Sequence, residues 1–214
     1  MNRREEISHN LQRIRAEIPA HVTLICVTKT YPLSDIDILK ECGEINFGEN
    51  RTSELVEKAR AISATWHYQG QIQSNKLKDL ASYADVVHSL DDISHVRKLD
   101  SLLQREIAAF IQVSLDGAPG RGGVLPENLH SIAEAITASV HISLLGLMAV
   151  APLNEEPDSA FARLATIHRD FLKDFPLATS LSAGMSNDFR SAIAHGATHI
   201  RIGSQILGSR PPLG

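Results

Sequence analysis

Eight short apolar segments alternate with amphipathic segments along the 214 residues, and this alternation constrains the fold more than any other feature of the sequence. Most of these segments are too uniformly hydrophobic to leave one face in water, as is typical of parallel strands covered on both faces. Strands separated by helices in this order predict a (β/α)8 TIM barrel of the α/β class, formed by residues 1–214 as one domain, with an open doubly wound sheet as the alternative. The predicted strands are Val22–Val27, Ile45–Phe47, Trp66–Tyr68, Val86–His88, Ala108–Val113, Ile142–Gly146, Ala178–Leu181 and His199–Ile202.

The segments between the strands carry the signals of helix starts and of helical periodicity. Ile7, Leu11, Ile14 and Ile18 recur at helical spacing and predict an extra helix at the N-terminus, ahead of the first strand. In each later segment, a residue that can cap or open a helix precedes apolar positions three or four apart. These helices are expected to begin near Ser34, Asn50, Asn75, Asp92, Pro126, Asp158 and Ser186.

Charge and cysteine content exclude several classes of protein. Lys and Arg total 21 against 25 Asp and Glu, for a net charge of −4, whereas binding to nucleic acid requires clustered positive charge. The two cysteines, Cys26 and Cys42, fit neither a disulfide framework nor a zinc site, and the ten histidines form no His-x-x-x-His pair within a predicted helix. We therefore expect a cytoplasmic protein that binds neither nucleic acid nor a metal ion.

No segment has the character of a membrane span or of a targeting signal. The first residues are charged from Arg3 to Glu6, unlike the apolar core of a signal peptide. The longest uncharged run, 135–153, is interrupted by Gly146 and Pro152, so the end of a helix followed by a strand explains it better than a membrane span.

Lys29 is the first candidate functional residue. Active residues of (β/α)8 barrels lie at the C-terminal ends of the strands and in the loops that follow, and Lys29 lies two residues after the end of the first predicted strand. A lysine desolvated at the barrel mouth can act as an amine nucleophile and form a Schiff base with an aldehyde. The alternative is an exposed lysine that pairs with a carboxylate.

The turns after the seventh and eighth strands are the second candidate, because these two loops frequently form a phosphate site in such barrels. Gly184 and Gly203 permit close approach of the backbone, and Ser186 and Ser204 add hydroxyl donors; two ordinary capped turns are the alternative. The glycine-rich run 117–123 lacks the Gly-x-Gly-x-x-Gly order, so we expect a flexible loop there. An amine and a phosphate cradle together suggest a phosphorylated aldehyde, and pyridoxal 5′-phosphate (PLP) carries both groups.

Six motifs lie at or beside the ends of predicted strands and cover nearly the whole chain. They are VTKTYP at 27–32, NFGENR at 46–51, WHYQGQIQSNK at 66–76, GLMAV at 146–150, LSAGMSNDF at 181–189 and HIRIGSQILG at 199–208. In this order they resemble the PLP homeostasis proteins, also called the YggS or PROSC family. That family resembles the N-terminal barrel domain of alanine racemase, the fold-type III PLP-binding proteins.

The resemblance implies a role for each main candidate residue. Lys29 would hold the aldehyde of PLP as a Schiff base, and Arg201 would face the pyridine nitrogen. Ser186, Gly203 and Ser204 would hold the phosphate.

Three further residues are carried over from the family. Asn50 would lie near the cofactor ring, and His67 and Met148 would belong to the wall of the pocket. The chain departs from the family pattern at Gln69, where an apolar residue is usual, and at Ala183, where methionine is common. These departures concern the packing of the wall.

The family supplies or buffers PLP, so the resemblance implies a monomeric PLP-binding homeostasis protein without a dedicated reaction, with PLP-dependent apoenzymes as transient partners. The first alternative is a racemase-like PLP enzyme acting on amino acids, which needs an acid or base on each face of its intermediate. Lys29 can serve one face, but the chain ends at Gly214, and we expect it to lack the domain that brings the opposing tyrosine. The second alternative is an aldolase that uses a lysine on a sugar phosphate, although such enzymes more often place that lysine on a later strand.

Overall fold

The parallel strands close into a barrel in chain order, so the (β/α)8 prediction is confirmed and the open sheet is wrong. The computed structural model describes residues 2–118 and 120–208. Each strand pairs with its predecessor in the chain, and β1 pairs with β8 to close the barrel, with Leu24 opposite Ile200. The strands are β1 (Thr23–Val27), β2 (Asn46–Glu49), β3 (Thr65–Tyr68), β4 (Val86–Leu90), β5 (Ile107–Gln112), β6 (Ile142–Met148), β7 (Ser180–Met185) and β8 (His199–Ile202).

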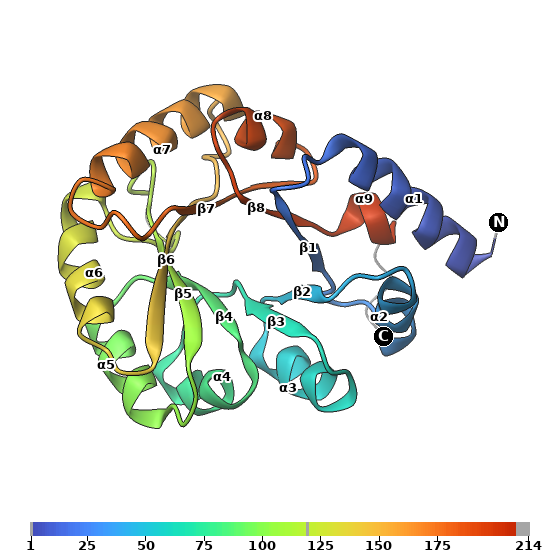
Figure 1. The fold of residues 1–214 in the computed structure, drawn as a ribbon, viewed down its shortest axis with the longest axis horizontal. Helices are drawn as coiled ribbons and strands as arrows, with labels where there is room; N and C mark the ends of the chain where they lie inside the picture. Colours follow the sequence, from blue (N-terminus) through green and yellow to red (C-terminus); the bar gives the residue numbers. More distant parts are fainter. Residues whose placement is uncertain (1, 119, 209–214) are drawn as a thin grey trace.

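The helices form an outer ring around the strands (Figure 1). Short 3-10 turns, η1 (Ser74–Lys76) and η2 (Pro126–Asn128), precede the fourth and sixth helices. Most of the core lies between strands and helices, where residues such as Ile36, Leu55 and Leu164 are fully buried. The helices are α1 (Arg3–Glu17), α2 (Leu33–Glu41), α3 (Thr52–Ala61), α4 (Leu77–Tyr83), α5 (Ile93–Leu102), α6 (Leu129–Thr137), α7 (Pro157–Phe171), α8 (Phe189–Ala194) and α9 (Ser204–Leu207).

The extra N-terminal helix, α1, packs beside α9 on the outside of the barrel (Figure 1). Ile7, Leu11 and Ile14 are buried, as the periodicity predicts. The Arg3 guanidinium donates to the buried Asp35 carboxylate of α2 and to the main-chain oxygen of Leu207 in α9. α1 therefore ties the first and last helices of the barrel together.

Four strands run past their predicted ends, to Glu49, Leu90, Met148 and Met185, and in two of them, β6 and β7, a glycine with positive φ lies inside the strand. Gly146 lies in β6 with φ +155°, and a Cβ there would come within 1.8 Å of the Ser180 main-chain oxygen. Gly184 lies in β7 with φ +90°, and its Cβ would come within 2.7 Å of the Ala192 Cβ. Such close approaches are a known use of glycine within a strand.

Several predicted helix caps are wrong by one or two residues. Arg51, not Asn50, precedes α3, and Asp188, not Ser186, precedes α8. β7 runs on to Met185, so α8 starts only after the turn in which the Met185 N–H donates to the Asp188 carboxylate at 2.5 Å. By contrast, Asp92 caps α5 as predicted, since its side chain accepts from the backbone N–H groups of the first turn. No helix in the described part of the chain is long and apolar enough to span a membrane.

Candidate functional site

A cavity of about 480 Å3 opens at the C-terminal ends of β1, β7 and β8, and this volume is within the range of small-ligand sites. The structure brings five of the predicted site residues into its lining, namely Lys29, Ser186, Arg201, Gly203 and Ser204. The loop after β6 supplies an apolar wall with Val150, Ala151 and Pro152. The cavity therefore lies where the fold class places active sites.

Lys29 lies in a tight turn that follows β1. The Tyr31 N–H donates to the Thr28 main-chain oxygen at 3.0 Å and closes this turn. Thr30 has φ +69°, and it is the non-glycine residue with positive φ among residues 2–118 and 120–208. A β-branched residue in this conformation costs about 1–3 kcal/mol and persists only where its surroundings impose it.

A buried network of charged groups imposes this turn. The Lys58 ammonium donates to the Thr28 main-chain oxygen at 2.7 Å, to Glu49 Oε1 at 2.7 Å and to Glu54 Oε2 at 2.9 Å. The Thr30 N–H donates to Glu54 Oε2 at 2.6 Å, and the Thr28 hydroxyl donates to Glu49 Oε1 at 2.6 Å. Thr28 and Thr30, on either side of Lys29, are thus both hydrogen-bonded to this network. These bonds fix the backbone position from which the Lys29 side chain extends.

The two carboxylates of this network have opposite pKa shifts. Burial raises the pKa of Glu49, although Lys58 and Thr28 oppose this shift. Burial alone would also raise the pKa of Glu54, but the Thr30 N–H and the Lys58 ammonium outweigh it and lower that pKa. The sequence contained a signal for part of this network, because Glu54 and Lys58 are four residues apart on one helix, but the prediction missed all three residues.

Arg201 is buried, with 4% of its surface exposed, and projects from β8. Its Nη1 donates to the Ser182 hydroxyl at 2.7 Å and its Nη2 to the Ala149 main-chain oxygen at 3.1 Å. Burial lowers the pKa of Arg201 to about 10, although the charge of Asp188 opposes this effect. The guanidinium therefore stays charged at neutral pH and has further N–H donors, five in total, for a ligand.

The turns after β7 and β8 meet at the other side of the cavity. The Ser204 hydroxyl donates to the Ser186 hydroxyl at 3.3 Å, and Gln205 Nε2 donates to the Ser186 main-chain oxygen at 2.5 Å. A Cβ on Gly203 would lie 3.0 Å from the Val27 main-chain oxygen, so the close approach of β8 to β1 leaves little room for a larger residue. This arrangement places two hydroxyl groups and a glycine turn around one point.

Three predicted site residues lie outside the lining of this cavity. Asn50 lines a separate surface hollow near the start of α3, beside Arg51 and Lys76. His67 and Met148 are 3% and 2% exposed. His67 bonds to His88 in the barrel interior, and Met148 packs with Phe110.

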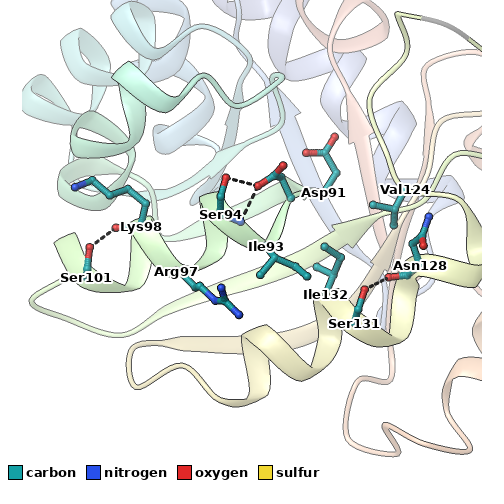
Figure 2. A pocket seen from close by; sticks show the side chains of 11 residues that line it. Asp91, Ile93, Ser94, Arg97, Lys98, Ser101, Val124, Asn128, Ser131 and Ile132 are labelled. Carbon is teal, nitrogen blue, oxygen red and sulfur yellow. Dashed lines mark hydrogen bonds between the residues drawn. The ribbon is translucent and has the colours of Figure 1, made fainter.

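A larger groove of about 900 Å3 lies on the outer face of the barrel, between α5 and the η2–α6 segment. Figure 2 shows that polar side chains line it, among them Arg97 from α5 and Asn128 from η2. Its lining shares no residue with the cavity at the ends of β1, β7 and β8 and contains none of the predicted site residues, so we assign the ligand site to the smaller cavity.

The glycine-rich segment contacts the rim of the ligand cavity through Arg121. This side chain donates to Asp116 at 3.0 Å and to the main-chain oxygens of Val150 at 3.3 Å and Ala151 at 3.0 Å. Pro119 lies outside the described residues. Arg121 therefore supports the loop that forms the apolar wall of the cavity.

Comparison with known proteins agrees with this assignment of the fold. The model of the alanine racemase N-terminal domain family matches residues 3–211. A PLP homeostasis protein of Corynebacterium glutamicum is 39% identical over 89% of this chain and 91% of that protein. The protein of the same name from Mycobacterium leprae is 34% identical over 97% of this chain and 94% of that protein.

A solved structure gives the same result. PipY of Synechococcus elongatus, solved with PLP bound, has a TM-score of 0.87 and 32% identity, over 94% of this chain and 100% of that one. The chain therefore belongs to the alanine racemase N-terminal domain family and, within it, to the PLP homeostasis proteins.

Proposed function

We propose that this chain binds PLP in the cavity at the barrel mouth and takes part in the homeostasis of this cofactor. The observation that carries the proposal is the convergence of a lysine amine, a buried guanidinium and a pair of serine hydroxyls on one cavity of about 480 Å3. The relatives named as PLP homeostasis proteins and the PLP-bound structure of PipY support it.

The donor set fits the chemical groups of PLP. An anion at the glycine turn would be met by the hydroxyls of Ser186 and Ser204, and the turn at Gly203 brings the backbone close. The cavity also contains the carboxylates of Glu155 and Asp188. Glu155 is paired with Arg163, and Asp188 accepts the Met185 N–H, so both are engaged by the protein.

Each residue has a separate task in this proposal. PLP supplies an aldehyde that condenses reversibly with primary amines. Lys29 presents its amine from a turn whose two flanking residues are held by buried charged groups. Arg201 donates hydrogen bonds to the ligand. Because its guanidinium remains charged, it neither takes a proton from the ligand nor gives one to it.

The composition of the lining favours binding over a racemase-like reaction. The tyrosines nearest the mouth turn their hydroxyls to the main chain: Tyr31 donates to the Gly208 oxygen at 2.6 Å and Tyr68 to the Gln71 oxygen at 3.3 Å. The described lining of the cavity contains no tyrosine that could act as an acid or base opposite Lys29. Transient transfer of PLP to apoenzymes, a monomeric state and a cytoplasmic location are parts of the same proposal.

The test is an absorption titration of the purified protein with PLP, followed by borohydride reduction and peptide mapping. We expect an absorption band in the visible or near-ultraviolet range that saturates at one equivalent, and a reduced label on Lys29. Lys29→Ala should lose the band, and Lys40→Ala, which removes an exposed lysine, should keep it. A label that maps to another lysine would overturn the assignment of Lys29, and no saturable binding would overturn the function. Release of an α-proton from added amino acids would favour the alternative, a racemase-like PLP enzyme.

A further inference from the structure

An uninterrupted chain of hydrogen-bonded side chains crosses the inside of the barrel and ends at Arg201. His67 Nε2 lies 3.1 Å from Asn46 Oδ1, and His67 Nδ1 lies 2.9 Å from His88 Nε2. His88 Nδ1 lies 2.9 Å from the Ser182 hydroxyl, which accepts from Arg201 Nη1 at 2.7 Å. These five residues come from β2, β3, β4, β7 and β8.

The Asn46 end of this chain, together with the neutral state of the two imidazoles, determines its direction. The side-chain oxygen of Asn46 can only accept, so His67 Nε2 must donate to it, and a neutral imidazole carries only one proton. His67 Nδ1 therefore accepts from His88 Nε2, and His88 Nδ1 accepts from the Ser182 hydroxyl, whose oxygen also accepts from Arg201. Each imidazole thus has one permitted neutral tautomer, with its proton on Nε2.

Burial supports this neutral arrangement. His88 and Ser182 are fully buried, and His67 is 3% exposed. Burial lowers the pKa of His67 to about 3 and that of His88 well below its ordinary value. The ring of Phe110 stacks on His88 with centroids 4.5 Å apart, which leaves that imidazole little freedom to turn.

The position of the chain is unusual for this architecture. β4 and β7 are not neighbours in the barrel, so the bond from His88 to Ser182 crosses the interior. The interior of such barrels is generally filled by branched apolar side chains, and buried polar groups are costly unless fully bonded. Every ring nitrogen of the two histidines has a partner here, so the chain satisfies its own groups and directs a single acceptor, the Ser182 oxygen, at the guanidinium.

We propose that Asn46, His67, His88 and Ser182 form a polarised hydrogen-bond relay that orients the Arg201 guanidinium toward the ligand cavity. The histidines are positioning residues, since they act through Ser182 and Arg201 and do not line the cavity. The inference rests on the proposed function, because the orientation of Arg201 matters to a ligand only if the cavity binds one.

The first test uses the protein without PLP. Long-range proton–nitrogen correlation spectra of protein labelled with 15N-histidine report the tautomer of each imidazole. We expect His67 and His88 both to carry the proton on Nε2 at neutral pH. A proton on Nδ1 of either ring, or averaging between the two forms, would overturn the relay.

The far end of the relay provides a variant that does not touch Arg201. Asn46→Ala removes the terminal acceptor from a partly exposed position. We expect the nitrogen signals of His67 to move and those of His88 to follow. A response confined to His67 would show that the bonds are not coupled and would overturn the proposal.

The second test measures the effect at the cavity. Ser182→Ala should weaken the affinity for PLP about tenfold, the change expected when one hydrogen bond of a charged group is lost, and should shift the absorption band of the bound cofactor. Ser180→Ala removes a hydroxyl from the same strand and should bind as the wild type does. Wild-type affinity and spectrum in Ser182→Ala would refute the positioning role. A wild-type protein that fails to bind PLP would refute the proposed function, while the tautomer measurement would still decide whether the relay exists.

Discussion

Two buried cations lie near the barrel mouth, and the protein balances their charges in opposite ways. Lys58, with 5% of its side chain exposed, bonds to the carboxylates of Glu49 and Glu54. Arg201 is equally buried, but its hydrogen bonds among the described residues go to two neutral oxygens, those of Ser182 and Ala149. The charge of Lys58 is therefore neutralised by carboxylates of the protein and stabilises the turn at Lys29. The charge of Arg201 remains available to a ligand.

The difference indicates which region serves stability and which serves binding. A buried ion pair that loses one partner leaves an uncompensated charge, which is strongly destabilising. A buried cation without a carboxylate partner lowers stability by its own desolvation, and its removal is correspondingly less harmful.

The largest effect is expected for Lys58→Met. The substitution leaves the buried Glu49 without its ammonium partner, so the free energy of unfolding should fall by about 3 kcal/mol. Arg201→Met should lower it by about 1 kcal/mol, since two neutral acceptors lose a donor. Urea denaturation measures both changes, with Lys40→Met as an exposed control. Equal losses for Lys58→Met and Arg201→Met would remove the contrast between the two regions.

An intermediate effect is expected for the dependence of stability on pH. Burial, followed by the charge of Arg201, lowers the pKa of His199 to about 4. Because an unfolded histidine binds a proton below about pH 6.5, the unfolded state takes up protons first, and stability should fall as the pH drops from 6.5 to 4.

The substitution His199→Asn isolates this group. It should reduce the slope of unfolding free energy against pH by about 1 kcal/mol per pH unit between pH 5 and 6. The carboxylates with lowered pKa values titrate below this window and contribute little to the slope. Urea midpoints measured from pH 5 to 7 provide the comparison, and an unchanged slope would mean that His199 titrates normally in the folded protein.

The smallest change in stability is expected for Ser204→Ala. This exposed hydroxyl makes one long bond, to Ser186, so the free energy of unfolding should stay within about 0.5 kcal/mol of the wild type. The affinity for PLP should fall about fivefold if the hydroxyl contacts the phosphate. Binding measured by absorption, together with denaturation of the same sample, separates the two effects. Unchanged affinity would remove Ser204 from the phosphate site.

Local patterns were sufficient to predict much of the site. Lys29 could be placed at a strand end from the alternation of apolar segments, and Ser186, Gly203 and Ser204 in the two turns that follow the last strands, whereas Arg201 was assigned through the family resemblance. The cavity contains all five. In a (β/α)8 barrel the C-terminal ends of all the strands lie at the same face. A residue placed at a strand end in the sequence is therefore also placed at the barrel mouth, without any knowledge of side-chain packing.

Other features depend on contacts between distant residues. The pairing of Lys58 with Glu49 and the bond from His88 to Ser182, 94 residues apart, have no periodic signature. Gly146 and Gly184 are a similar case. Only the segments packed against them, at Ser180 and Ala192, show that each glycine lies within a strand and permits a close approach there.

Sequence patterns alone were enough to predict the architecture and the edge of the barrel at which the site lies. Hydrophobic periodicity and turn chemistry act over a few residues, so they can be recognised in one dimension. The partners of the buried charges and imidazoles, by contrast, could be identified only in the folded barrel. Desolvation in the interior makes any unpaired polar group costly, and its partner can come from any strand that faces the same enclosed space.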